Sequence, residues 1–156
     1  MSTINEKLKV LNLNLPSLPK PAGLYLPALQ VGLLVFTSGI LPYGKDGSIA
    51  YTQQIDNSSI DDGREATHCA LLNALAVLKD TLGGDLDNIE RIVKLTGYVN
   101  SQTGFCQQPQ VINAASEILI NIWGEKGKHV RTAIGVNELP FGSSVELELI
   151  VQVKKV

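Results

Sequence analysis

The sequence predicts a single α+β domain in which two helices cover one face of a mixed β-sheet. Its 156 residues, 44% of them hydrophobic and 18% charged, suit one compact domain with a substantial core. Helical periodicity occurs twice, over residues 61–84 and 108–123. Strand-like segments lie before, between and after these helices, so each helix links two strands and both can pack on the same face.

The strand segments are read from β-branched residues, alternation and turn signals. Residues 24–39 predict two strands with a break near residues 30–32, and 40–51 predict a hairpin around turn residues. Residues 88–100 alternate as one strand, and 129–153 predict two strands joined through 137–144.

The helix ends carry their own signals. Asp61 or Asp62 is expected to cap the first helix, and Gly83-Gly84 to end it. Before the domain, which we place at residues 24–156, residues 1–23 form an N-terminal extension. This extension is expected to hold a short helix followed by an extended, proline-rich arm from Pro16 to Gly23.

The last strand places two kinds of residue on its two faces. Alternation puts Val145 and Leu147 toward the helices and Glu146 and Glu148 on the uncovered face. An uncovered face of this kind favours self-association. We expect the strand that begins near Arg131 to be the antiparallel neighbour of the last strand, so that a guanidinium and a carboxylate meet near one cleft.

That pair allows two interpretations. Arg131 could bind a small carboxylate in a bidentate manner, with Glu146 acting as a base on water. Alternatively, the two charges form an ordinary cross-strand or inter-subunit ion pair.

Composition excludes several other classes. A net charge of −2 without a basic run argues against a nucleic-acid partner. No signal peptide or run of about 18 apolar residues is present, so we expect a cytoplasmic protein without a membrane partner. Cys69 and Cys106 lack CxxC spacing, and His68 and His129 lack partners at ligand spacing, so we expect neither a disulfide nor a metal site.

Several segments resemble the Rid/YjgF family of reactive intermediate imine deaminases, also called endoribonuclease L-PSP. The C-terminal stretch "VRTAIGVNELPFGSSVELELIVQV" matches the family signature in Arg131, Leu139-Pro140 and residues 145–148. "GLYLPALQVGLLVFTSGILP", "DNIERIVKLTGYVNS" and "VINAASEIL" match its opening segment, central strand and second helix. Together these segments run from about residue 22 to 153, with the longer N-terminus and extra residues around "QQIDNSSIDD" typical of a side branch.

The resemblance implies a chorismate-mutase-like fold and a homotrimer whose ligand clefts lie between subunits. It implies hydrolysis of 2-imino acids or enamines to 2-keto acids and ammonia without a metal or organic cofactor. Arg131 would bind the substrate carboxylate and Glu146 would position the attacking water. The substrate-binding residues carried over by the match are Tyr25, Ser38, Asn113 and Ala133.

This sequence departs from the family at two places in the site. Ala133 stands where many active deaminases have cysteine, at a position expected to contribute mainly backbone contacts. Leu24 replaces a proline and could move Tyr25. A non-catalytic protein that binds a small carboxylate is therefore the alternative function, and ribonuclease activity is a less favoured third.

Overall fold

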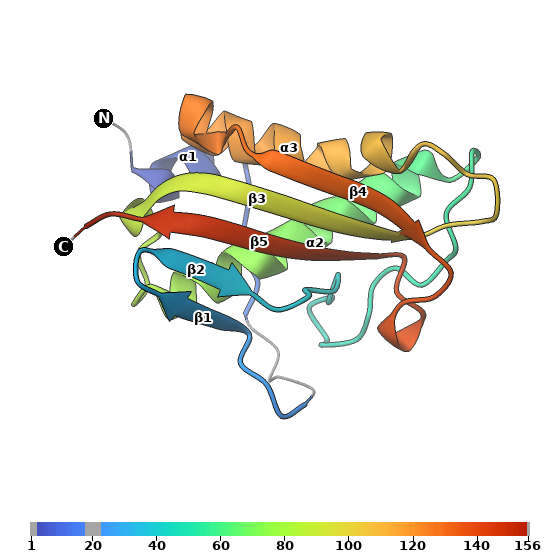
Figure 1. Ribbon diagram of the computed structural model, residues 1–156, viewed down its shortest axis with the longest axis horizontal. Helices are drawn as coiled ribbons and strands as arrows, with labels where there is room; N and C mark the ends of the chain where they lie inside the picture. Colours follow the sequence, from blue (N-terminus) through green and yellow to red (C-terminus); the bar gives the residue numbers. More distant parts are fainter. Residues whose placement is uncertain (1–2, 18–22, 156) are drawn as a thin grey trace.

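The computed structural model describes residues 3–17 and 23–155 and confirms the predicted α+β class. One five-stranded mixed sheet carries the long helices α2 and α3 on a single face (Figure 1). The helices are α1 (Ile4–Val10), α2 (Ile60–Thr81) and α3 (Gln108–Trp123), with single 3-10 turns at η1 (Leu86–Asn88), η2 (Gly124–Gly127) and η3 (Pro140–Gly142). The strands are β1 (Ala28–Val31), β2 (Leu34–Thr37), β3 (Ile89–Asn100), β4 (Val130–Val136) and β5 (Val145–Val153).

The sheet has the order β1-β2-β5-β3-β4, which places β3 between the two C-terminal strands. β3 pairs antiparallel with β5 and parallel with β4. The helix α3 makes the crossover that a parallel pair requires, and in Figure 1 it runs beside β4 at the edge of the sheet. The expectation that β4 and β5 are neighbours is therefore wrong, although they do run in opposite directions.

The two faces of the sheet have different environments. The helix face holds the core, to which β5 contributes every second residue from Val145 to Val153, all at most 5% exposed. The open face carries apolar side chains that remain in contact with solvent, including Leu29, Phe36, Val130 and Ile134. A solvated sheet face with this many exposed apolar groups is suited to burial against another surface.

The local predictions near the N-terminus are met in part. The helix α1 buries Ile4 and Leu8, and a capping box formed by Thr3 and Glu6 starts it. The expected extended arm falls largely on residues 18–22, which lie outside the described residues. The break between the first two strands comes at residues 32–33, close to its predicted position.

Two predicted details differ from the structure. Ser59, not Asp61 or Asp62, occupies the N-cap of α2, and the two aspartates fall in the first turn, where their charges favour the helix dipole. Residues 40–51 form a turn closed by the isolated bridge between Tyr43 and Ile49, with a second isolated bridge from Ile40 to Leu147, in place of the expected hairpin strands.

Gly97 allows α3 to approach β3 closely. A Cβ atom there would collide with the side chain of Ile112, lying 2.6 Å from its Cγ1 and close to its Cδ1.

We predict that Gly97→Ala destabilises the protein by about 1–3 kcal/mol, because it overpacks this contact. Adding Ile112→Val removes the Cδ1 methyl group and should recover part of the loss, a coupling measurable by urea denaturation of both single variants and the double variant. Strictly additive free energies of unfolding would contradict the proposed contact.

Candidate functional site

Arg131 is the second residue of β4 and points to the helix face. Along β4 the half-buried residues are Arg131, Ala133 and Val136, whereas Val130 and Thr132 are exposed. The guanidinium Nη1 of Arg131 donates to Asn113 Oδ1 at 2.8 Å and to Ser116 Oγ at 3.1 Å. Asn113 and Ser116 are one helical turn apart on α3 and therefore present a common polar face to the strand.

These two bonds leave half of the guanidinium available. Nη1 has two hydrogens and both are used, whereas within the described part of the chain Nε and Nη2 of Arg131 have no hydrogen-bond partner. Arg131 also has no ion pair with a described carboxylate. The Nε–Nη2 edge of a guanidinium matches the two oxygens of a carboxylate, so Arg131 is arranged to bind an anion.

Glu146 lies on the opposite, open face of the sheet. It is the second residue of β5 and is paired in register with Tyr98 on β3. Its carboxyl group packs against Gly39, where any side chain would collide with it. Burial raises the pKa of Glu146, and the neighbouring Glu148 raises it further. A carboxyl group with a raised pKa can exchange a proton with water or a substrate nearer to neutral pH.

Tyrosines surround this carboxyl group. Tyr98 donates a hydrogen bond to Glu148 at 3.2 Å. Burial raises the pKa of Tyr43, and the proximity of Tyr25 and Glu146 raises it further. Tyr25 and Glu146 therefore both lie near Tyr43. Tyr43 was not among the predicted site residues.

Ser38 connects the segment that carries Tyr25 to the segment under Glu146. Its hydroxyl donates to the Leu26 carbonyl at 2.6 Å and its amide to the Pro27 carbonyl at 2.8 Å. Ser38 therefore ties the residues that follow Tyr25 to the end of β2, directly before Gly39 and its contact with the Glu146 carboxyl group.

The six predicted site residues thus form two groups. Arg131, Asn113 and Ala133 lie on the helix face at the β4 edge, and Glu146, Tyr25 and Ser38 lie on the open face. The expected meeting of Arg131 with Glu146 does not occur within one chain, because β3 separates β4 from β5 and the two side chains point to opposite faces. In register, Arg131 is opposite Leu95 whereas Glu146 is opposite Tyr98.

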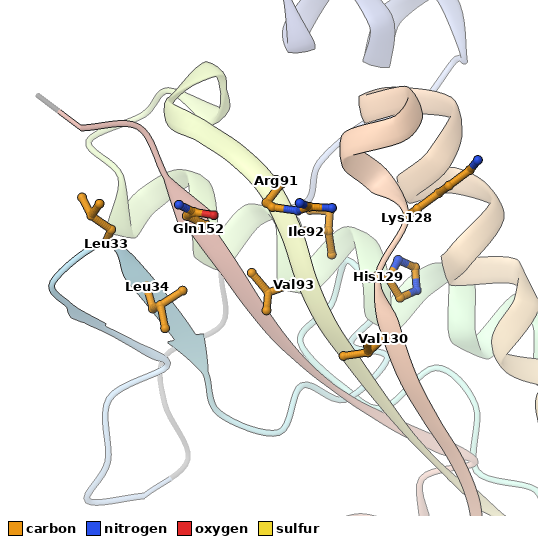
Figure 2. Close-up of a pocket in the computed structure, with 9 residues that line it drawn as sticks. All are labelled: Leu33, Leu34, Arg91, Ile92, Val93, Lys128, His129, Val130 and Gln152. Carbon is orange, nitrogen blue, oxygen red and sulfur yellow. The ribbon is translucent and has the colours of Figure 1, made fainter.

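An open hollow of about 720 Å³ lies beside the start of β4. Residues of β2, β3, β5 and the start of β4 line it, including Arg91, Lys128 and His129 (Figure 2). Neither Arg131 nor Glu146 lines this hollow. His129, which lines the hollow, lies two residues before Arg131, so the hollow adjoins the Arg131 group without including Arg131 itself.

Ser116 and His129 complete the surroundings of Arg131. Ser116 was not among the predicted site residues, and His129 was weighed only as a metal ligand. The signal available in the sequence was that Ser116 is a polar residue three positions after Asn113, which places both on the same side of the helix. In residues 3–17 and 23–155, no three His, Cys, Asp or Glu side chains are grouped to hold a metal ion.

Comparison with known proteins identifies the family. A family model described as "YjgF/chorismate mutase-like, putative endoribonuclease" matches residues 5–153. The chain belongs to the YjgF family. Among the helices of the described residues, none has the length and apolar character needed to cross a bilayer.

Several family relatives cover nearly the whole chain. Protein TCP17 of Trypanosoma cruzi is 34% identical over 150 residues, which are 96% of this chain and 93% of the relative. The crystal structure of Atu1372 from Agrobacterium tumefaciens, a protein of unknown function, has a TM-score of 0.88 at 37% identity and covers 98% of this chain and 94% of its own. A structure from Shewanella oneidensis, described as a "putative endoribonuclease", has a TM-score of 0.91 at 31% identity and covers 97% of this chain and 100% of its own.

A more distant structure contains a small ligand. Escherichia coli TdcF was solved with bound serine; it has a TM-score of 0.59 at 23% identity, covering 88% of this chain and 94% of its own. This similarity shows the shared fold.

We predict that Glu148→Gln lowers the pKa of Glu146 while leaving it above the ordinary value, because burial remains. Carbon-detected NMR titration of the Glu146 carboxyl measures this, with Glu125→Gln as a charge-removing control elsewhere.

The raised pKa also means that Glu146 contributes stability below about pH 4.3 that is lost as pH rises through its folded pKa. As pH rises through the folded pKa of Glu146, the free energy of unfolding of Glu146→Gln should therefore increase relative to that of wild type. A difference between the two free energies that stays constant over this pH range would contradict the raised pKa.

Proposed function

We propose that this chain hydrolyses 2-imino acids and their enamine tautomers to 2-keto acids and ammonia. The observation that carries the proposal is the half-occupied guanidinium of Arg131, whose Nη1 is anchored on α3 and whose Nε–Nη2 edge is free for a carboxylate. The serine bound in TdcF, a small molecule with a carboxylate group, is compatible with such a ligand in this family.

We place the site between subunits of a homotrimer. Arg131, Asn113 and Ala133 of one subunit would face Tyr25, Ser38 and Glu146 of the next. Two features support this arrangement: the groups lie on opposite faces within one chain, and the open face exposes large apolar residues such as Val130 and Leu29. Burial of that apolar surface would provide the free energy for association.

In the proposed reaction, Arg131 holds the substrate carboxylate and fixes C2 of the imine near Glu146. The Glu146 carboxylate takes a proton from water as the water oxygen bonds to C2, and the electron pair of the C=N bond moves to nitrogen. The protonated Glu146 then returns its proton to that nitrogen, which gives a carbinolamine with a hydroxyl and an amino group on C2. Glu146 next takes the hydroxyl proton and passes it to the nitrogen, so that the C2–O bond becomes a carbonyl as the C2–N bond breaks and ammonia leaves. A raised pKa suits a group that must both accept and donate a proton.

The remaining residues would complete the substrate contacts. The Asn113 amide nitrogen can donate to the substrate while its oxygen holds Arg131. The Ser38 hydroxyl, whose proton goes to Leu26, retains lone pairs toward the cleft. Ala133 would contribute its backbone and leave space where other members carry a cysteine, and Tyr25 would close the opposite side. Hydrolysis of an imine by this route requires no metal or organic cofactor.

We predict that Arg131→Ala lowers kcat/KM for freshly generated 2-iminobutanoate by about a hundredfold or more, since the carboxylate loses its partner. Arg64→Ala is the matched control, because it removes a guanidinium that forms a surface ion pair with Glu117 at 2.8 Å. Keto-acid release is measured against the buffer rate.

Three other results would redirect the assignment. A folded wild-type protein that does not accelerate the reaction of any imino acid would refute the proposal. Retained carboxylate binding with no loss of turnover in Glu146→Gln would favour the binding protein. RNA cleavage that is lost in Arg131→Ala would favour the ribonuclease.

We further predict that Arg131→Ala and Glu146→Gln complement each other when unfolded together and refolded as mixed trimers. A cyclic trimer containing both variants has one junction that combines an intact Arg131 with an intact Glu146. Roughly a quarter of wild-type activity should therefore return from an equal mixture. Inactivity of the refolded mixture, with trimers confirmed by light scattering, would contradict a site shared between subunits.

A further inference from the structure

A chain of hydrogen bonds connects Arg131 to the backbone that follows α3. Arg131 Nη1 lies 3.1 Å from Ser116 Oγ, which in turn lies 3.1 Å from His129 Nε2. On the other side of the imidazole ring, His129 Nδ1 lies 2.6 Å from the Gly127 carbonyl oxygen. The chain thus runs from β4 through α3 to the turn η2.

The two ends of this chain fix the direction of each bond. Arginine can only donate, so Ser116 Oγ accepts from Arg131; a carbonyl can only accept, so Nδ1 of His129 carries a proton. Nε2 of the neutral ring is then an acceptor and takes the Ser116 hydroxyl proton. The hydroxyl of Ser116 is thereby turned so that a lone pair faces Arg131.

The surroundings of His129 favour the neutral ring that this arrangement needs. Burial lowers the pKa of His129, and the charge of Arg131 lowers it further, against the opposite influence of the bond to Gly127. Figure 2 shows the ring at the start of β4, between that strand and the helix.

The far end of the chain is held in place by close packing. A Cβ atom at Gly127 would collide with the Leu119 carbonyl and would lie 2.8 Å from Ile120 Cα. The turn η2 is therefore packed directly on the backbone of α3, and the Gly127 carbonyl is a fixed acceptor.

We propose that Ser116 and His129 are positioning residues that set the orientation of the Arg131 guanidinium for carboxylate binding. This inference rests on the proposed function, in which Arg131 binds the substrate carboxylate. Asn113 holds one hydrogen of Nη1 and the Ser116–His129 pair holds the other. Fixing both hydrogens fixes the plane of the guanidinium and presents its Nε–Nη2 edge before the ligand arrives, which reduces the ordering cost of binding.

The test compares Ser116→Ala, Ser116→Thr and His129→Phe with wild type and Arg131→Ala. Calorimetry with 2-oxobutanoate gives Kd, and hydrolysis of 2-iminobutanoate gives kcat and KM. We expect Ser116→Ala and His129→Phe to raise Kd and KM about tenfold with kcat within about twofold, as loss of uniform binding does. Ser116→Thr keeps the hydroxyl and should restore both values, and Ser58→Ala, which loses a hydroxyl bonded to Asp56 at 2.7 Å, serves as control.

The outcomes separate the two proposals. Arg131→Ala binding 2-oxobutanoate as well as wild type would overturn the proposed role of Arg131 and this inference with it. Arg131→Ala losing binding while Ser116→Ala and His129→Phe bind normally would overturn only the positioning role. Failure of Ser116→Thr to restore binding that Ser116→Ala loses, with both variants equally stable to heat, would also overturn it.

Discussion

The parallel pairing of β3 with β4 decides where the candidate residues lie. Because α3 returns the chain to the outer side of β3, β4 becomes an edge strand directly beside that helix. Arg131 can then reach two polar side chains on α3. The same pairing places β5 on the other side of β3, so the carboxylates of β5 cannot reach the arginine of their own chain.

The open face carries the acidic part of the candidate site, whereas the β4 edge carries the basic part. Glu146 and Glu148 alternate with core residues of β5, and Tyr98 donates its hydroxyl proton to Glu148. Burial of Glu146 disfavours its ionisation, and the neighbouring Glu148 disfavours it further. Among the described residues, Arg131 has no carboxylate partner and Glu146 has no cationic partner, so each half of the candidate site carries the charge that the other half needs.

The sequence predicted the fold class and many elements because periodicity is a local property. The helix over residues 108–123 and the alternation of β5 follow directly from side-chain spacing. The sequence did not predict which strand is the neighbour of β4. The connection over residues 137–144 is eight residues long and can reach either the adjacent strand or the next one, about 10 Å away. β3 is long and most of its residues are buried, as is typical of a central strand. Its central position becomes evident only when the strands are compared with one another.

Some site residues could be predicted from the sequence, whereas others are revealed only by contacts between elements of the folded chain. Arg131 and Glu146 were identified as charges in strands and through family resemblance, whereas Ser116 and His129 acquire meaning only when α3, η2 and β4 come together. A serine in a helix and a histidine before a strand are ordinary residues in a sequence. Placed 3.1 Å apart, with an arginine on one side and a fixed carbonyl on the other, they form a directed hydrogen-bond chain. Since Asn113 alone can hold only one of the two Nη1 hydrogens, this chain accounts for how the fold keeps Arg131 in one orientation while leaving its other edge free.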